Sequence, residues 1–161
     1  MQGANLRAGG SRLFSKALEL NPQEAAALIG LADMLGKFSD LQGSAQRLRE
    51  LVAFSPDDGE ALLRLGVDLC RSGRGRQGRQ VLRHLLETPA SPWILRLAYE
   101  SLATSLLDES GLGDALAVLV DAVEILPEAQ RPYLLTALVF DRLGRPHESI
   151  DMVRRDRKSV V

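Results

Sequence analysis

Two glycine-rich stretches have spacings that could bind phosphate. Residues 73–78 read Gly-Arg-Gly-Arg-Gln-Gly, which matches the G-x-G-x-x-G pattern of dinucleotide-binding loops. That chemistry needs the glycines between a strand and a helix, so that N–H groups at the helix start face a pyrophosphate. A helical pattern precedes this stretch and no strand is predicted, so we interpret it as a turn between helices. The stretch from Gly30 to Lys37 has one residue too many for a phosphate loop and lies inside a helical pattern.

A thiol and an imidazole are the other candidates for catalysis. Cys70 and His84 are residue types that can form a nucleophile and its base, but no third group is placed to orient them. Asp57 and Asp58 are adjacent carboxylates whose position before a helix is explained by capping. With one cysteine and two histidines in 161 residues, neither a disulfide framework nor a multi-ligand metal site is expected. The sequence therefore predicts a protein that is not an enzyme and has no cofactor.

A run of arginines could bind an anionic partner. No acidic residue occurs between Asp68 and Glu87, and clustered arginines can meet phosphates or an acidic peptide. The possible anionic patch comprises Arg74, Arg76, Arg79 and Arg83. Their helical spacing and the lack of interleaved aromatic residues favour a solvated convex face instead. A formal charge of −1 for the whole chain also argues against nucleic acid as the partner.

The composition is that of a protein with a packed core. Hydrophobic residues make up 45% of the chain and aromatic residues only 4%, so aliphatic side chains must fill the core. No run approaches the roughly 18 apolar residues of a membrane span, and no basic region followed by an apolar stretch opens the chain. These observations favour a cytoplasmic location. The chain can also be a fragment of a longer protein, in which case they carry less weight.

Helical periodicity extends from Ser11 to Arg157 and predicts helix pairs joined by short turns. Asn21, Ser55 and Ser91 each precede a proline, an arrangement that predicts a capping side chain followed by proline at the first helical position. Ser39 has the capping-box spacing to Gln42. The predicted helices are residues 11–20, 22–36, 40–54, 56–71, 75–87, 92–107, 112–125, 127–143 and 146–158.

The proline-led helix starts recur at a nearly constant interval. Pro22 and Pro56 are 34 residues apart, Pro92 follows after 36, and Pro127 after 35. A period near 34 is typical of helix–turn–helix solenoids. Small residues also recur within the first helix of each pair, where a bulky side chain would separate the paired helices: Ala32, Gly66, Ala103 and Ala137.

With these features the chain resembles the tetratricopeptide repeat family. The resemblance covers about nine-tenths of the chain and implies an all-α, right-handed α-solenoid of antiparallel helix pairs. We expect a single domain over 1–161, with a half-repeat at 1–21 and repeats at about 22–55, 56–91, 92–126 and 127–161. The register slips by about three residues near Trp93, which predicts a longer loop or an extra helical turn. Trp93 itself either packs outside that bend or anchors a partner.

The resemblance also implies a non-catalytic scaffold or adaptor that binds a peptide or helix in a concave groove. First helices line that groove in the family. The matching positions are Ile29, Asp33, Lys37, Leu63, Arg64, Val67, Arg71, Glu100, Thr104, Leu134 and Leu138. Several of them are apolar, which argues against the acidic-tail specificity that some family members have.

An apolar C-terminal part leaves a second possibility open. Leu134, Leu135 and Leu138 with Val139 and Phe140 make the last first-helix apolar on nearly every side, so it needs cover on both faces. That cover is a further repeat, a partner segment or a second copy bound through the C-terminal helices. Self-association through the ends of the solenoid is therefore an alternative to partner binding.

Overall fold

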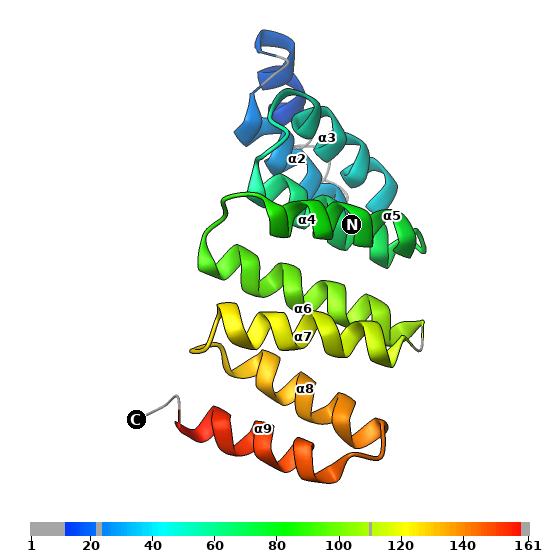
Figure 1. Cartoon of the computed structure of the whole chain (residues 1–161). Coiled ribbons are helices and arrows are strands. Elements are labelled where there is room, and N and C mark those ends of the chain that lie inside the picture. Colours follow the sequence, from blue (N-terminus) through cyan, green and yellow to red (C-terminus); the bar gives the residue numbers. More distant parts are fainter. Residues whose placement is uncertain (1–11, 22–23, 110, 159–161) are drawn as a thin grey trace. The chain divides into compact units, whose positions relative to one another are not determined.

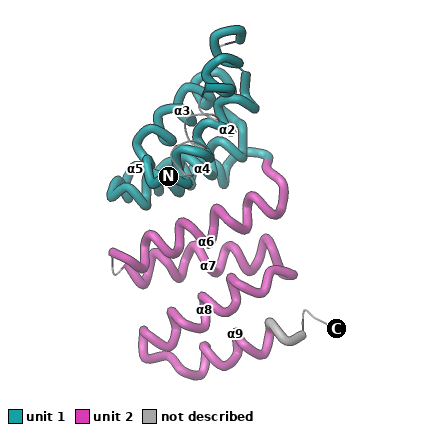
Figure 2. Tube along the Cα trace, turned by 180° about the vertical axis from the view of Figure 1, so that it is seen from behind, with its two compact units in different colours: residues 1–89 teal, residues 90–161 magenta. Residues whose placement is uncertain are grey.

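The computed structural model describes residues 12–21, 24–109 and 111–158, with side chains as far as residue 155. The chain divides into two compact units, residues 1–89 and 90–161 (Figure 2). In the described part of the chain all the regular elements are helices, and none is long and apolar enough to cross a membrane. The prediction of one domain over 1–161 stays a prediction.

Each unit is a series of helices in which every helix packs on the next one along the chain (Figure 1). In the first unit a helical segment at 12–20 precedes four helices. These are α2 (Ala25–Lys37), α3 (Leu41–Phe54), α4 (Gly59–Arg71) and α5 (Gly75–Glu87). The second unit has α6 (Pro92–Asp108), α7 (Leu112–Ile125), α8 (Gln130–Arg142) and α9 (Pro146–Lys158). The predicted helix pairs are thus present in both units.

The helices α2, α4 and α8 begin three residues later than expected. For α4 and α8 the reason is that the proline lies in a turn rather than in the helix, whereas Pro22 lies outside the described residues. The N–H of Asp58 bonds to the carbonyl of Ser55 at 3.1 Å, so Pro56 is the second residue of a turn, where proline is favoured. Asp58 rather than Ser55 then caps α4, accepting the N–H of Ala61 at 2.9 Å. The same turn bond joins Ala129 to Leu126 before α8 and Glu24 to Asn21 before α2. The predicted caps at Asn21 and Ser55 are therefore wrong.

The helix α6 is the exception and explains the slip in register. Its first residue is Pro92, as predicted, and Ser91 is the N-cap residue, although its side chain makes no capping hydrogen bond. As a result α6 has 17 residues, where α2, α4 and α8 have 13. The extra-turn interpretation is confirmed. The capping box predicted at Ser39 is wrong, because the side chain of Asp40 accepts the N–H of Gly43 at 2.9 Å.

Three of the turns within helix pairs have the same conformation in the described part of the chain. Ser39, Gly73 and Gly144 occupy equivalent positions with φ of 63°, 80° and 71°. The N–H of the following residue bonds to the carbonyl five residues earlier, as from Arg74 to Leu69 at 2.9 Å, which is the pattern of a Schellman helix end. Gly73 thus ends α4. The G-x-G-x-x-G stretch is a turn between helices, as we interpreted it.

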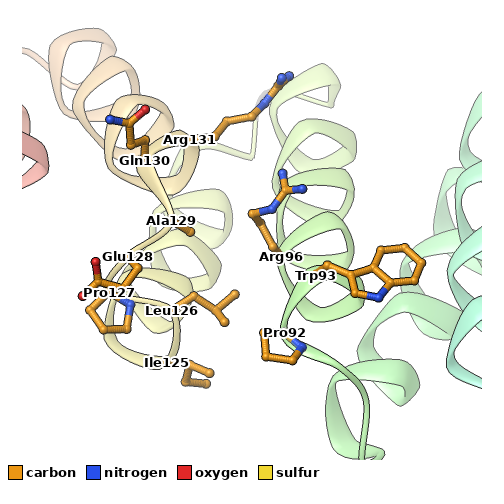
Figure 3. Close-up of a pocket in the computed structure, with 10 residues that line it drawn as sticks. All are labelled: Pro92, Trp93, Arg96, Ile125, Leu126, Pro127, Glu128, Ala129, Gln130 and Arg131. Atoms are coloured by element: carbon orange, nitrogen blue, oxygen red, sulfur yellow. The ribbon is translucent and has the colours of Figure 1, made fainter. Parts of the chain in front are cut away.

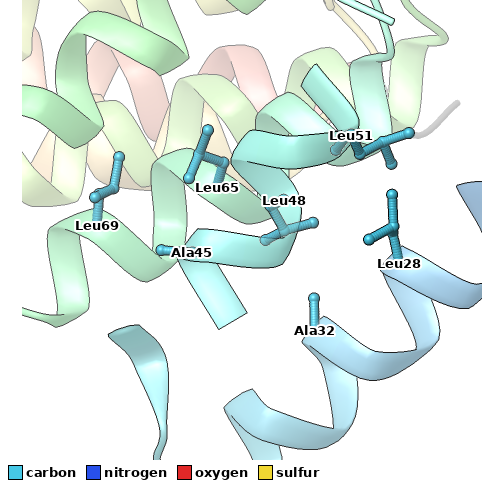
Figure 4. Close-up of a cluster of buried hydrophobic side chains, with 8 residues drawn as sticks. Leu28, Ala32, Ala45, Leu48, Leu51, Leu65 and Leu69 are labelled. Atoms are coloured by element: carbon cyan, nitrogen blue, oxygen red, sulfur yellow. The ribbon is translucent and has the colours of Figure 1, made fainter. Parts of the chain in front are cut away.

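Small residues bring paired helices into contact, as the sequence predicts. A Cβ atom on Gly66 would lie 2.6 Å from Cγ of Leu82, and one on Gly78 would lie 2.6 Å from the carbonyl oxygen of Gly66. In other helix pairs a buried alanine is the small residue that allows close approach, as Ala32 and Ala103 show. The close approach lets leucines from successive helices meet in one cluster in the first unit (Figure 4). The cluster contains Leu28, Ala32, Ala45, Leu48, Leu51, Ala61, Leu65 and Leu69.

Candidate functional site

The first helices of unit 1 carry an ion-pair network on the predicted groove positions. The guanidinium of Arg64 on α4 donates to the carboxylate of Asp33 on α2 at 2.8 Å and to that of Glu60 at 2.9 Å. The ammonium of Lys37 lies 2.8 Å from the second oxygen of Asp33. The structure therefore brings three of the predicted residues together. They bind one another across two repeats.

These contacts shift the ionisation of the network. The hydrogen bond from Lys37 does most to hold the pKa of Asp33 below its usual 3.8, and Arg64 adds to this against the effect of burial. Burial opposes the charge of Arg64, but its bonds to Glu60 and Asp33 outweigh that effect and raise its pKa. The side chains are a third or more exposed, so water screens the interaction.

The remaining predicted groove residues of unit 1 differ in exposure. Lys37 and Arg71 are exposed, and Ile29 and Val67 are half-buried. Leu63 is only 6% exposed, so it belongs to the core and offers little surface to a partner. The prediction for Leu63 took its position from the family pattern, which does not show how much neighbouring helices cover it.

Unit 2 repeats the arrangement with a buried acid. Glu100 on α6 is 7% exposed. Its two carboxylate oxygens lie 3.1 Å from Arg96 of the same helix and 3.2 Å from Arg131 on α8. The acid and the arginine of the next first helix are 31 residues apart here, as Asp33 and Arg64 are in unit 1. This equal spacing was a signal in the sequence that could have identified both cross-repeat pairs. Thr104 is exposed one turn after Glu100 and donates to its carbonyl at 2.8 Å.

The helix α8 exposes apolar side chains on one face. Leu134 is 51% and Leu138 42% exposed, while Val139 and Phe140 on the opposite side are buried. The residues i and i+4 of a helix lie on the same face, so the two leucines form one stripe. The sequence predicts that this helix needs cover on both faces, and in the described part of the chain one apolar face is left exposed.

A pocket of about 760 Å³ lies in unit 2 between the start of α6 and the turn that joins α7 to α8. Figure 3 shows the side chains of Ile125 and Leu126 extending toward α6, where Pro92 faces them. Arg96 and Arg131 lie at one end of the pocket, while the carboxylate of Glu128 points away from it (Figure 3). The pocket thus has an apolar wall and a basic end.

Trp93 also lines this pocket, at its edge. Its indole ring is 50% exposed and points away from the α7–α8 turn (Figure 3). The two roles that the sequence leaves open for Trp93 both stay predictions. Six of the ten pocket residues are consecutive, at 125–130, and comprise the end of α7, the turn and the first residue of α8.

The predicted arginine patch is smaller than expected. Arg74, Arg76 and Arg83 are exposed, but Arg79 is only 9% exposed. A helical spacing of three to four residues does not tell which side of α5 faces its neighbours, and Arg79 lies on the packed side. A patch of the other three arginines stays a prediction.

The candidates for catalysis are not brought together. Cys70 is half-buried with its sulfur 4.0 Å from the carbonyl of Gly75, whereas His84 is exposed. Among the described residues, no group of three or more His, Cys, Asp and Glu side chains could hold a metal ion.

A buried carboxylate links two repeats of unit 1. The hydroxyl of Ser44 on α3 donates to Asp68 on α4 at 2.5 Å, and Asp68 is 9% exposed. Burial raises the pKa of Asp68 above its usual 3.8, against the lowering effects of Ser44 and Arg71. The protonated form is therefore favoured more in the folded than in the unfolded chain. The raised pKa of Asp68 contributes stability that is present below the pKa of this group in the unfolded chain. That stability is lost as the pH rises through the pKa of the group in the folded chain.

We expect Asp68→Asn to stabilise the protein relative to wild type near neutral pH, and to lose this advantage as the pH falls to about 4. Asparagine keeps an oxygen that accepts from Ser44 but has no charge to desolvate. The measurement is urea unfolding of both proteins at several pH values. Ser44→Ala, which removes the donor, is expected to cost about 1–3 kcal/mol. A difference between Asp68→Asn and wild type that does not change with pH would contradict the assignment.

The sequence matches no family model, and it matches no curated protein. Solved structures are similar to it in fold. A crystal structure of MamA superposes with a TM-score of 0.81 at 16% identity, over 95% of this chain and 88% of that one. PilF of Pseudomonas aeruginosa gives 0.78 at 16% identity, over 98% and 73%. YrrB, described as a TPR protein with an unusual peptide-binding site, gives 0.72 at 15% identity, over 98% and 80%.

Identities this low show the fold alone. Those structures and the helix pairs with small residues at their contacts agree with the resemblance seen in the sequence. The chain is therefore an all-α solenoid with the tetratricopeptide repeat type of fold.

Proposed function

We propose that this chain is a non-catalytic scaffold that binds a peptide or a helix of a partner protein on the face formed by its first helices. The observation that supports this most is the stripe of Leu134 and Leu138 on α8. Apolar surface that is left exposed beside a pocket is a feature of interaction sites. A cytoplasmic location stays a prediction.

The similarity to YrrB supports the same proposal. That protein is described as having a peptide-binding site, and it shares this fold. In unit 1 the proposed binding face comprises Ile29, Asp33, Lys37, Arg64, Val67 and Arg71. In unit 2 it comprises Glu100, Thr104, Leu134 and Leu138. Leu63 is left out because it is buried.

The test replaces both leucines of the stripe with glutamate. Because the two side chains are about half exposed, charges there leave the core intact and should disrupt only contacts with a partner. Immobilised wild-type and variant chains are compared for the proteins that they retain from a lysate of the source cell, identified by mass spectrometry. We expect the double variant to lose the specific set.

Val120→Glu is the matched control, since Val120 is 37% exposed and lies on α7, a second helix. This variant should retain the same set as wild type. Retention of the full set by the Leu134→Glu, Leu138→Glu variant, with its helicity and melting temperature unchanged, would refute the proposed face.

Self-association is the second candidate function. Ile150 on α9 is 50% exposed, so the C-terminal part of unit 2 shows apolar side chains on two helices. Light scattering over a concentration series distinguishes the two functions. A mass that rises with concentration, and does so less in Ile150→Glu, would favour self-association over binding of another protein.

A further inference from the structure

The pocket of unit 2 combines an apolar wall with a positive charge. Pro92, Ile125 and Leu126 supply the wall. At the basic end, two guanidinium groups share the one carboxylate of Glu100, which leaves a net charge of +1 (two positive, one negative). Glu128 also lines the pocket, but its carboxylate points outward, away from the two guanidinium groups (Figure 3).

The arginines are held in place and still have donors to offer. Each makes its contact to Glu100 through one nitrogen, and a guanidinium has five N–H donors. The side chain of Arg131 is 68% exposed and that of Arg96 39%. Two guanidinium groups fixed by a buried acid form a ready site for a second, incoming carboxylate.

The surroundings of the pocket favour a peptide as the source of that carboxylate. Leu134 lies one turn after Arg131 on α8, so the apolar stripe continues from the basic end of the pocket. A volume of about 760 Å³ accepts more than one side chain. An extended segment can therefore place an apolar side chain against Leu126, an acid at the arginines and a further apolar group on Leu134.

We propose that this pocket binds a partner segment in which a leucine-sized apolar side chain stands within two residues of an acidic side chain. The proposal rests on the proposed function, because it names the class of segment that the first-helix face of unit 2 takes. Affinity comes mainly from burial of the apolar side chain. The carboxylate sets the register and the selectivity.

The experiment selects peptides from a phage-displayed random library on the immobilised chain and titrates the enriched peptides in solution. Trp93 is the only tryptophan of the chain, and it lies within one helical turn of Arg96. Its indole ring lies at the edge of the pocket, so its fluorescence reports on a peptide that extends over that edge. We expect enriched sequences to pair an acid with a bulky apolar residue and to change the emission of Trp93 saturably.

The matched variants are Arg131→Gln and Arg142→Gln, which remove one charge each from exposed positions of α8. Arg131→Gln should weaken binding about tenfold or more, the effect of losing one charge-assisted hydrogen bond. Arg142→Gln should leave the affinity within about twofold. Glutamine at 131 leaves Glu100 its contact with Arg96, so the fold is expected to persist.

Four outcomes would overturn the proposal. Enriched peptides that contain no acidic residue would refute the pocket and leave the proposed function standing. The same holds if the Arg131→Gln variant binds the enriched peptides as tightly as wild type while the Leu138→Glu variant does not bind them. Enrichment of no peptide would count against both. A shift of Trp93 emission that depends on protein concentration without peptide would assign the pocket to a second copy of the chain.

Discussion

Replacing Gly78 with alanine is expected to lower the free energy of unfolding by about 2–3 kcal/mol, because it forces the two helices of one pair apart. A Cβ atom at this position would lie 2.6 Å from the carbonyl oxygen of Gly66 and 2.8 Å from the backbone nitrogen of Cys70, and closer still to the sulfur of Cys70. Two of the three contacts are backbone atoms, which a rotamer change cannot relieve. This cost exceeds the gain of about 1 kcal/mol that alanine usually brings to a helix interior.

Gly113→Ala is the matched control for this change. Gly113 lies in the first turn of α7, and a Cβ atom there would meet nothing within 4 Å. Its replacement should therefore raise the free energy of unfolding by up to about 1 kcal/mol. Urea unfolding followed by far-UV circular dichroism measures both. Equal effects of the two substitutions would show that the α4–α5 contact is not as close as the structure has it.

The prediction for Gly78 also explains why a dinucleotide-binding pattern occurs in this chain. Gly73 is needed for its φ of 80° at the end of α4, and Gly78 is needed for contact with Gly66. Two independent structural requirements, five residues apart, thus account for the first and the last glycine of the pattern. The pattern in the sequence was real, and only the elements around it identified its purpose.

The sequence was sufficient to predict which segments form helices, but it was insufficient to predict the first residue of each helix. The predicted bounds of α5, α7 and α9 agree with the structure. Gly73 marks the turn before α5, and Gly144 marks the turn before Pro146, the first residue of α9. The starts of α4 and α8 were three residues early. Proline fits both the first position of a helix and the second position of a turn, so local preference does not distinguish them. For α4 the start of the helix is set by Asp58, whose side chain caps it in place of Ser55.

The candidate site was predicted less well, since exposure and pairing depend on neighbouring repeats. Leu63 and Arg79 satisfy the helical pattern but are covered by other helices. The bond of Arg131 to Glu100 joins residues 31 positions apart, beyond any local window. Four of the ten residues that line the pocket in unit 2 lie in the turn between α7 and α8, where no periodicity constrains the side chains. Position in a repeat therefore predicts which helix a residue occupies, and packing decides what it can bind.

The second large effect is expected at Leu119, where truncation to alanine should cost about 3 kcal/mol. Leu119 on α7 has no exposed surface and contacts Ala103 on α6 and Val139 on α8 in the core of unit 2. Removal of the side chain leaves a cavity among three helices that are already in contact, so little of the loss can be recovered by relaxation. Thermal and urea unfolding measure the change.

Leu134→Ala is the counterpart that separates packing from binding. With 51% of the side chain exposed, its truncation should change the free energy of unfolding by less than about 0.5 kcal/mol. The same substitution should weaken peptide binding, because Leu134 belongs to the exposed stripe. Leu119→Ala should instead leave the affinity of the folded fraction close to wild type at temperatures well below its melting transition. If Leu134→Ala destabilised the protein as much as Leu119→Ala, then the stripe would be part of the core and no longer a candidate binding face.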